Sequence, residues 1–202
     1  MTKFTKVFLA AATLALLAGP AQAYEKGDML LRVGAGNVDP KSDNSAIADV
    51  DSGASLVFNG TYFFSPNLAI EVLAAAPFSH DIKLDADGSK VGETKHLPPT
   101  VSLQYHFLSD SGFRPYLGAG LNYTLFFDEE TTGALTGTDL DLDASFGLAA
   151  QVGADFDVSD RMFLNLDVRW IDINTDASID GGTPFEVEVD PIVYSLTLGW
   201  KF

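Results

Sequence analysis

The sequence predicts an all-β protein, an eight-stranded antiparallel transmembrane β-barrel with short periplasmic turns and long extracellular loops. The first observation is the stretch 142–158, where apolar residues occupy every second position and mostly small or polar residues lie between them. Because successive side chains of a strand point to opposite faces, this alternation predicts one long strand. A strand of a soluble protein usually has about five or six residues. The greater length is typical of a strand that crosses a membrane with lipid on its apolar face.

Seven further stretches repeat the alternation, and the length of their connections is the second observation. The eight predicted strands are 29–38, 54–64, 68–76, 100–108, 113–127, 142–158, 162–173 and 192–202. Three connections are tight turns, at 65–67, 109–112 and 159–161, and the other four are long and acidic. This regular change between short and long connections is the layout of an outer-membrane barrel. A soluble sandwich also has alternating strands, but nothing in it makes the connections alternate in length.

The first 23 residues are predicted to be a cleaved signal peptide. Lys3 and Lys6 give a basic start, residues 7–18 an apolar core, and 21–23 an Ala-Gln-Ala cleavage site. The apolar core is too short to cross a bilayer as a helix, which needs about 20 residues. We therefore expect the barrel to occupy residues 24–202.

The remaining chain is strongly acidic. Without the two lysines of the signal peptide it has 10 basic residues (12 minus 2) against 28 acidic ones, a net charge of −18. This charge argues against a nucleic-acid partner, whose phosphates need Lys and Arg. We interpret the segments that hold most acids, 39–51, 80–96, 128–143 and 174–190, as solvated loops. The chain has no cysteine, so disulfides and thiolate chemistry are excluded.

Side chains that face the barrel interior predict a charged plug toward the periplasmic end. An eight-stranded barrel is about filled by its own side chains, so a water-filled pore is not expected. The inward charged residues are Glu71, Arg114, Asp155, Asp157, Asp167, Arg169 and Lys201. We expect these opposite charges to pair inside the barrel.

The outer end of the interior is predicted to be apolar. Its inward residues are Val57, Leu73, Phe126, Ile171, Ile173 and Val193, with Phe78 and Leu97 just above them. An apolar mouth over a polar plug is typical of a pocket for a small hydrophobic molecule. The sequence is equally compatible with residues that only pack beneath a cap of loops.

Three prolines predict a lateral opening between the third and fourth strands. Pro77 ends the third strand, and Pro98 and Pro99 begin the fourth. Proline cannot donate a backbone hydrogen bond, so we expect unpaired carbonyls and a local gap near the outer leaflet. A solute could leave through this gap into the membrane. The prolines are equally compatible with a role as simple strand terminators.

No metal, cofactor or catalytic site is expected. The Asp-x-Asp-x-Asp run at 139–143 lacks the glycine and distal glutamate of an EF-hand loop. His80 and His96 could meet across a hairpin, but two histidines without a third ligand do not predict a metal site. His106 faces the periplasmic end of the lumen and has no evident serine partner, so enzyme activity is not expected.

Several longer strings resemble one family. They are IEVLAAAPFSHDI at 70–82, HLPPT at 96–100, FRPYLGAGLNYTLFF at 113–127, GLAAQVGAD at 147–155 and the ending WKF at 200–202. Together they resemble the outer-membrane protein W (OmpW) family over essentially the whole chain after the signal peptide. The resemblance implies a barrel in the outer membrane of a Gram-negative bacterium, with a hydrophobic channel that carries small apolar compounds inward, as in related alkane-uptake proteins.

The resemblance also implies roles for single residues. Leu73 matches a position that lines the apolar gate, and Phe202 matches the C-terminal aromatic read by the barrel-assembly machinery. Tryptophan can occupy the position of Arg169 in the family, so the arginine leaves the depth of any apolar cavity open.

The residues together with the family resemblance predict passive uptake of small hydrophobic molecules, with lateral exit into the membrane. The alternative is a non-transporting envelope barrel that serves membrane integrity, adhesion or phage reception. The expected partners are outer-membrane lipids and lipopolysaccharide, apolar solutes and the assembly machinery.

Overall fold

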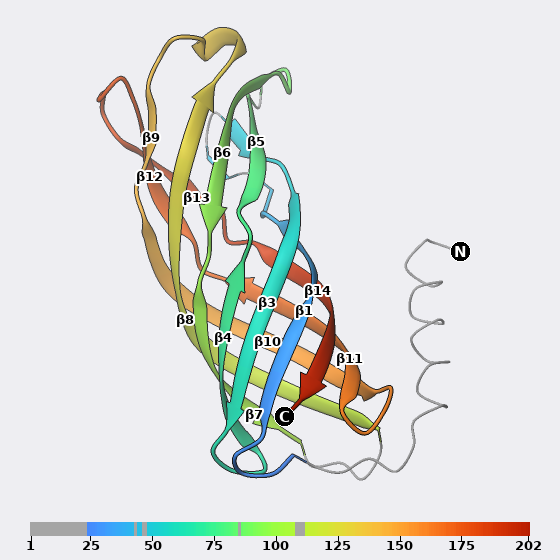
Figure 1. Cartoon of the computed structure of the whole chain (residues 1–202). Helices are drawn as coiled ribbons and strands as arrows, with labels where there is room; N and C mark the ends of the chain where they lie inside the picture. Colours follow the sequence, from blue (N-terminus) through green and yellow to red (C-terminus); the bar gives the residue numbers. More distant parts are fainter. Residues whose placement is uncertain (1–23, 43, 46–47, 85, 108–111) are drawn as a thin grey trace.

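A computed structural model of the chain describes residues 24–42, 44–45, 48–84, 86–107 and 112–202. The predicted signal peptide and residues 109–111 of one predicted turn lie outside these ranges. Figure 1 shows a tilted barrel whose strands continue, at one end, into a taller and more open group of strands. No helix among the described residues is long and apolar enough to span a membrane.

Eight strands close the barrel. They are β1 (Met29–Asp39), β3 (Gly53–Phe63), β4 (Leu68–Ala75), β7 (Thr100–His106), β8 (Phe113–Thr131), β10 (Ser145–Asp157), β11 (Met162–Ile171) and β14 (Ile192–Lys201). Each is antiparallel to both of its neighbours in the barrel, and β14 pairs with β1 to close the ring. The predicted eight-stranded antiparallel barrel is confirmed.

The outer surface of the barrel is an apolar band. On β10, Phe146 and Leu148 are 70% and 59% exposed, while Ser145, Ala149 and Gln151 between and beyond them are buried. Equivalent outward Leu, Val, Phe and Tyr side chains are exposed on the other barrel strands. Such a band facing lipid, with polar side chains alternating inward, is what a membrane-spanning barrel requires.

The acidic segments are not simple loops, which corrects their interpretation from the sequence. They contain the further strands β2 (Ala48–Val50), β5 (Phe78–Leu84), β6 (Lys90–Leu97), β9 (Leu140–Leu142), β12 (Asn174–Ile179) and β13 (Phe185–Glu188). The β5–β6 hairpin pairs with the upper part of β8, and β12 joins β9 to β13. We call these six strands, with β8 from Phe126 onward, the loop extension. It forms because alternate residues in these segments are apolar, with the acids on the outer side.

The interior is layered along the barrel axis. A small apolar cluster of Tyr24, Leu30, Phe63, Ala69 and Phe163 lies at the end with the short turns. A charged network comes next, then a larger apolar cluster that reaches into the loop extension. The candidate site lies above this larger cluster.

Candidate functional site

The charged network is centred on a fully buried arginine of β1. Arg32 Nη1 lies 3.1 Å from Glu71 Oε2, and Arg32 Nη2 lies 3.0 Å from Asp155 Oδ2. Arg169 Nη2 donates to the second carboxylate oxygen of Glu71 at 2.5 Å. Glu71 therefore accepts hydrogen bonds from two guanidinium groups. Such charge-assisted hydrogen bonds are among the strongest in proteins.

Neutral groups satisfy further carboxylate oxygens of the network. Gln104 Nε2 donates to Glu71 Oε2 (2.8 Å), Tyr116 Oη to Asp167 Oδ2 (2.9 Å), Tyr24 Oη to Asp155 Oδ2 (2.7 Å) and Asn165 Nδ2 to Asp155 Oδ1 (2.8 Å). Together with the bonds of Arg32 on β1, they join β1, β4, β7, β8, β10 and β11 across the lumen. These buried groups fill the interior at this level, as expected for a barrel of eight strands.

Six of the seven predicted plug residues lie in or beside this network. Glu71, Asp155, Asp167 and Arg169 belong to it, and the pair Arg114–Asp157 lies beside Tyr24. The seventh, Lys201, does not belong to the network, contrary to the prediction.

Lys201 is partly exposed, and its Nζ lies 3.5 Å from Asp28 Oδ2 at the rim of the barrel. A long lysine at the end of a strand keeps its ammonium in water while its stem covers the rim. Arg32 and Tyr24 were not among the predicted plug residues, although alternation along 29–38 places Arg32 on the inward face.

An apolar layer covers the charged network. It consists of Val38, Val57, Leu73, Phe78, Ala149, Ile171, Ile173, Val189 and Val193, with Phe126 packed against it. Seven of the eight predicted channel residues are in this group. Arg169 lies two residues before Ile171 on β11 but points to Glu71, so the charged and apolar levels meet between these two residues.

Leu97 is the eighth predicted channel residue, and it does not face the interior. It pairs in register with Leu125, which is exposed on the outer surface, while its neighbour His96 is buried. Because side chains alternate along β6, an inward His96 turns Leu97 outward. This corrects the prediction for Leu97.

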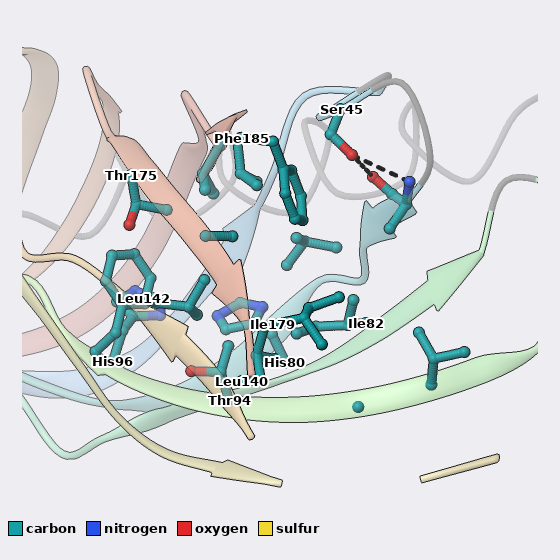
Figure 2. A pocket seen from close by; sticks show the side chains of 18 of the residues that line it. Ser45, His80, Ile82, Thr94, His96, Leu140, Leu142, Thr175, Ile179 and Phe185 are labelled. Carbon is teal, nitrogen blue, oxygen red and sulfur yellow. Dashed lines mark hydrogen bonds between the residues drawn. The ribbon is translucent and has the colours of Figure 1, made fainter. Parts of the chain in front are cut away.

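An apolar cavity of about 130 Å³ lies above the apolar layer, enclosed by the loop extension. Figure 2 shows labelled side chains of β5, β6, β9 and β12 gathered around it. Its apolar lining includes Ile82, Leu84, Val91, Phe126, Leu140, Leu142, Ile173, Ile179, Phe185, Val187 and Val189. None of the described lining residues is an Asp, Glu, Lys or Arg. Only Phe126 and Ile173 of the predicted channel residues line this cavity directly.

Two stacked histidines supply polar atoms to this apolar lining. The rings of His80 on β5 and His96 on β6 lie 4.8 Å apart, and Phe78 stacks on His96 at 5.4 Å. His80 Nδ1 is 2.6 Å from the Asp51 carbonyl oxygen. Because a carbonyl only accepts, Nδ1 carries the proton and Nε2 of the neutral ring is an acceptor.

Both histidines are neutral at physiological pH. Burial lowers the pKa of His80 below its ordinary value, and burial together with the neighbouring His80 lowers the pKa of His96 to about 3. The Nε2 atoms of both rings are buried without a hydrogen-bond partner. No group of three or more His, Cys, Asp or Glu side chains among the described residues is arranged to hold a metal ion.

Sequence reasoning brought the two histidines together across a hairpin but did not assign them to the pocket. The signal for the pocket was the alternation Phe78, His80, Ile82, Leu84 within a segment that was interpreted as a loop. The many acids of this segment favoured its interpretation as a solvated loop.

The hydrogen-bond ladder between the third and fourth barrel strands is interrupted beside the apolar layer. Pairing of β4 with β7 ends at Leu73 and Thr100, and pairing resumes between β5 and β6 at Phe78 and His96. Residues 74–77 and 97–99 have no ladder pairs with each other in this stretch.

The three prolines lie in the interrupted stretch, but the expected unpaired carbonyls are not found. Thr100 Oγ1 donates to Pro98 O at 3.0 Å and the Tyr123 N–H to Pro99 O at 3.0 Å, while the one Ser55 hydroxyl lies 3.2 Å from Pro77 O and 3.1 Å from Ala76 O and is shared between them. Side chains and the adjacent strand therefore replace the missing ladder bonds. The interruption itself remains.

A closed barrel of eight antiparallel strands, with an apolar outer band and a charged interior, defines the class of outer-membrane β-barrel proteins. The model of the OmpW family matches residues 25–202, and the chain therefore belongs to the OmpW family.

Known proteins of the outer membrane are similar over most of the chain. Outer membrane protein W of Vibrio cholerae serotype O1 is 41% identical over 207 residues, covering 93% of this chain and 94% of that protein. Outer membrane protein AlkL of Ectopseudomonas oleovorans is 36% identical over 185 residues, covering 88% and 76%. The crystal structure of OprG from Pseudomonas aeruginosa has a TM-score of 0.80 and 35% identity, covering 89% and 98%.

The protein is thus located in the outer membrane of a Gram-negative bacterium, among lipid. In outer-membrane barrels the short turns face the periplasm and the long loops face the outside, so the loop extension is extracellular.

Proposed function

We propose that the protein is a passive channel for small hydrophobic molecules, which enter the extracellular pocket and leave sideways into the membrane. The observation that carries this proposal is the cavity of about 130 Å³, whose described lining has no formally charged residue. Pockets of this kind bind ligands mainly through apolar contact. The family resemblance, with its hydrophobic channel, supports the same class of solute. No catalytic step is part of the proposal.

The apolar layer connects the pocket to the lateral exit. Phe126 and Ile173 touch both the cavity and the layer, and Leu73 belongs to the layer. Leu73 is also the last paired residue of β4 before the interrupted ladder. An apolar solute that displaces these side chains therefore reaches the level of Pro77, Pro98 and Pro99 without meeting a charge.

A route straight down to the periplasm is unfavourable for the same solute. It would have to separate the buried ion pairs of Arg32 and Arg169 with Glu71. Charges left unpaired in an apolar environment are costly. The plug therefore directs the solute sideways.

The test is solute entry into vesicles whose outer leaflet is lipopolysaccharide. Nitrobenzene entry is followed by quenching of pyrene-labelled lipid in the inner leaflet, with protein-free vesicles as background. Wild-type protein should accelerate entry, and Leu73→Asp should reduce the protein-dependent rate by roughly tenfold, because a carboxylate would lie in the apolar route. Leu73→Met is the matched control, since it conserves volume and polarity, and should stay within about twofold of wild type.

Folding of each variant is checked by the heat-dependent shift in SDS gels. A folded Leu73→Asp protein with wild-type entry would show that the route does not pass Leu73. If wild-type protein gives no acceleration at all, the proposal fails and the non-transporting envelope barrel is the better description.

A further inference from the structure

We infer that the extracellular pocket selects neutral apolar molecules with one hydroxyl group, and that single-ring phenols are the class that fits it. The inference rests on the proposed binding of apolar solutes in this same pocket, and it adds a polar requirement at one position. It is carried by the geometry of His80 and His96.

His80 has a hydrogen-bond acceptor without a partner. Its Nδ1–H is engaged by the Asp51 carbonyl at 2.6 Å, which leaves Nε2 as a lone-pair acceptor. Nε2 is buried without a partner in a lining that is mainly apolar, its other uncharged polar residues being His96, Ser45, Thr94 and Thr175. A buried acceptor without a donor is unfavourable, so a ligand that supplies an O–H or N–H gains more than one that is purely apolar.

The stacked partner ring, His96, presents a second nitrogen atom without a hydrogen-bond partner. His96 Nε2 is also buried without a hydrogen-bond partner, and the two rings are 4.8 Å apart. A neutral histidine presents either a donor or an acceptor at this atom. A hydroxyl group has one hydrogen and two lone pairs, so it can donate to His80 Nε2 and accept from His96 when that ring carries its proton on Nε2. An ether or a ketone cannot satisfy His80.

The lining of the cavity excludes charged ligands. No Lys or Arg is among the described residues that line the cavity, so a carboxylate would enter without a counter-charge. Asp51 and Asp81 lie close enough to His80 to act on it electrostatically, which further disfavours an anion. An ammonium group would lose its hydration among apolar side chains. Neutral O–H and N–H donors remain, and of these the hydroxyl is also a good acceptor for an N–H of His96.

The volume of the cavity limits the size of the ligand. An engineered apolar cavity of about 150 Å³ binds benzene, and the cavity here measures about 130 Å³. Phe126 and Phe185 lie in its wall and offer aromatic faces. A single aromatic ring with one hydroxyl therefore matches the volume, the apolar wall and the paired histidines together.

The experiment compares four fluorinated probes by ¹⁹F NMR with the full protein in lipid nanodiscs. The probes are 4-fluorophenol, 4-fluoroanisole, fluorobenzene and 4-fluorobenzoate, and protein-free nanodiscs give the lipid background. Each is titrated into wild type, His80→Phe and His80→Leu. The second variant is included because a phenylalanine ring could shift into the cavity. His106→Gln is the matched control, since His106 is a buried histidine beneath the plug.

The quantity that decides is the ratio of the anisole and phenol dissociation constants. Each variant is characterised by the wild-type value of this ratio divided by the variant's value, which cancels the general apolarity of each probe. For both His80 variants we expect a quotient of about five to ten, because the phenol loses one hydrogen bond. For His106→Gln we expect a quotient of about one. The ¹⁵N signal of His80 Nε2 should move upfield only with the phenol.

The outcomes separate this inference from the proposed function. If all neutral probes bind and both His80 variants keep the wild-type ratio, the hydroxyl requirement is wrong while the apolar pocket stands. Benzoate binding as tight as phenol binding would overturn the restriction to neutral ligands. If no probe binds wild type, the pocket is not a ligand site and both proposals fail.

Discussion

Arg32 links two carboxylates from different strands across the barrel interior. Its guanidinium contacts Glu71 of β4 and Asp155 of β10, and all three side chains are at most 1% exposed. Buried ion pairs contribute little net stability relative to an apolar core, but removing one partner leaves the others uncompensated. The residue therefore matters mainly through what its loss would leave behind.

Replacing Arg32 with methionine should strongly destabilise the barrel. Glu71 would keep Arg169, but Asp155 would lose its only nearby guanidinium among the described contacts. A loss of about 3–5 kcal/mol is expected, as for other broken buried pairs. The measurement is urea-induced unfolding in lipid vesicles, followed by tryptophan fluorescence.

Lys201→Met is the matched control for this change. It also removes one cation, but the pair with Asp28 is partly exposed at the rim. Such a pair contributes about 0–1 kcal/mol. Equal effects of the two substitutions would contradict the central place given to Arg32.

Single residues show where sequence reasoning succeeds and where it stops. Alternation along a strand is local, so it placed Glu71, Asp155 and Arg169 on the inward face. Which inward charges meet depends on strand register and tilt, which no local pattern contains. The partners of Arg32 and the rim position of Lys201 therefore required the structure.

At the scale of elements, the loop extension is the main difference between expectation and structure. Residues 185–189 read Phe-Glu-Val-Glu-Val, which is strand alternation with acids at every second position. High acidity predicts a loop, yet no Asp or Glu is among the described residues that line the pocket, and Lys83 pairs with Asp51 and Lys95 with Asp128 at partly exposed positions. The eight barrel strands were predictable because lipid makes one face uniformly apolar.

The interrupted ladder is the element that the lateral exit depends on. Closing it with a disulfide should slow release of solute into the membrane. Cysteines at Ala76 and Leu97 would lie on opposite sides of the interruption. Oxidation is confirmed by mass spectrometry, and nitrobenzene entry is measured before and after reduction of the same sample.

We expect the rate of nitrobenzene entry to be at least about fivefold lower for the oxidised protein than for the reduced sample. The rate should recover on reduction. The two single-cysteine variants control for the substitutions themselves. Equal rates with the disulfide in place would mean that the exit lies at another seam of the barrel.

At the scale of the whole molecule, the barrel is stable because its sheet closes on itself, with the short interruption at 74–77 and 97–99 bridged in part by other hydrogen bonds. Every backbone polar group in lipid must pair with a neighbouring strand, and only a closed barrel allows this for strands. The ring is closed by β1 and β14, which pair from Leu30 and Lys201 up to Asp39 and Ile192. The last rung of this seam involves the final residue of the sequence.

Phe202 takes part in closure through its backbone, not its side chain. Its N–H donates to Met29 O at 2.9 Å, and its carbonyl accepts from the Met29 N–H at 3.3 Å. The residue is 74% exposed at the periplasmic rim. Its loss therefore removes two hydrogen bonds, about 1 kcal/mol each, but leaves no cavity in the core.

Deleting Phe202 should accordingly affect assembly in cells far more than refolding in detergent. Refolding yield should stay close to wild type, because the remaining rungs of the seam are unchanged. In cells, the fraction of heat-shifted, SDS-resistant barrel should fall severalfold if the exposed aromatic ring is what the assembly machinery reads. Phe202→Ala keeps both backbone bonds and should reproduce the cellular defect, while Phe202→Tyr should restore assembly. Equal losses in detergent and in cells would instead assign Phe202 a purely structural part in closing the barrel.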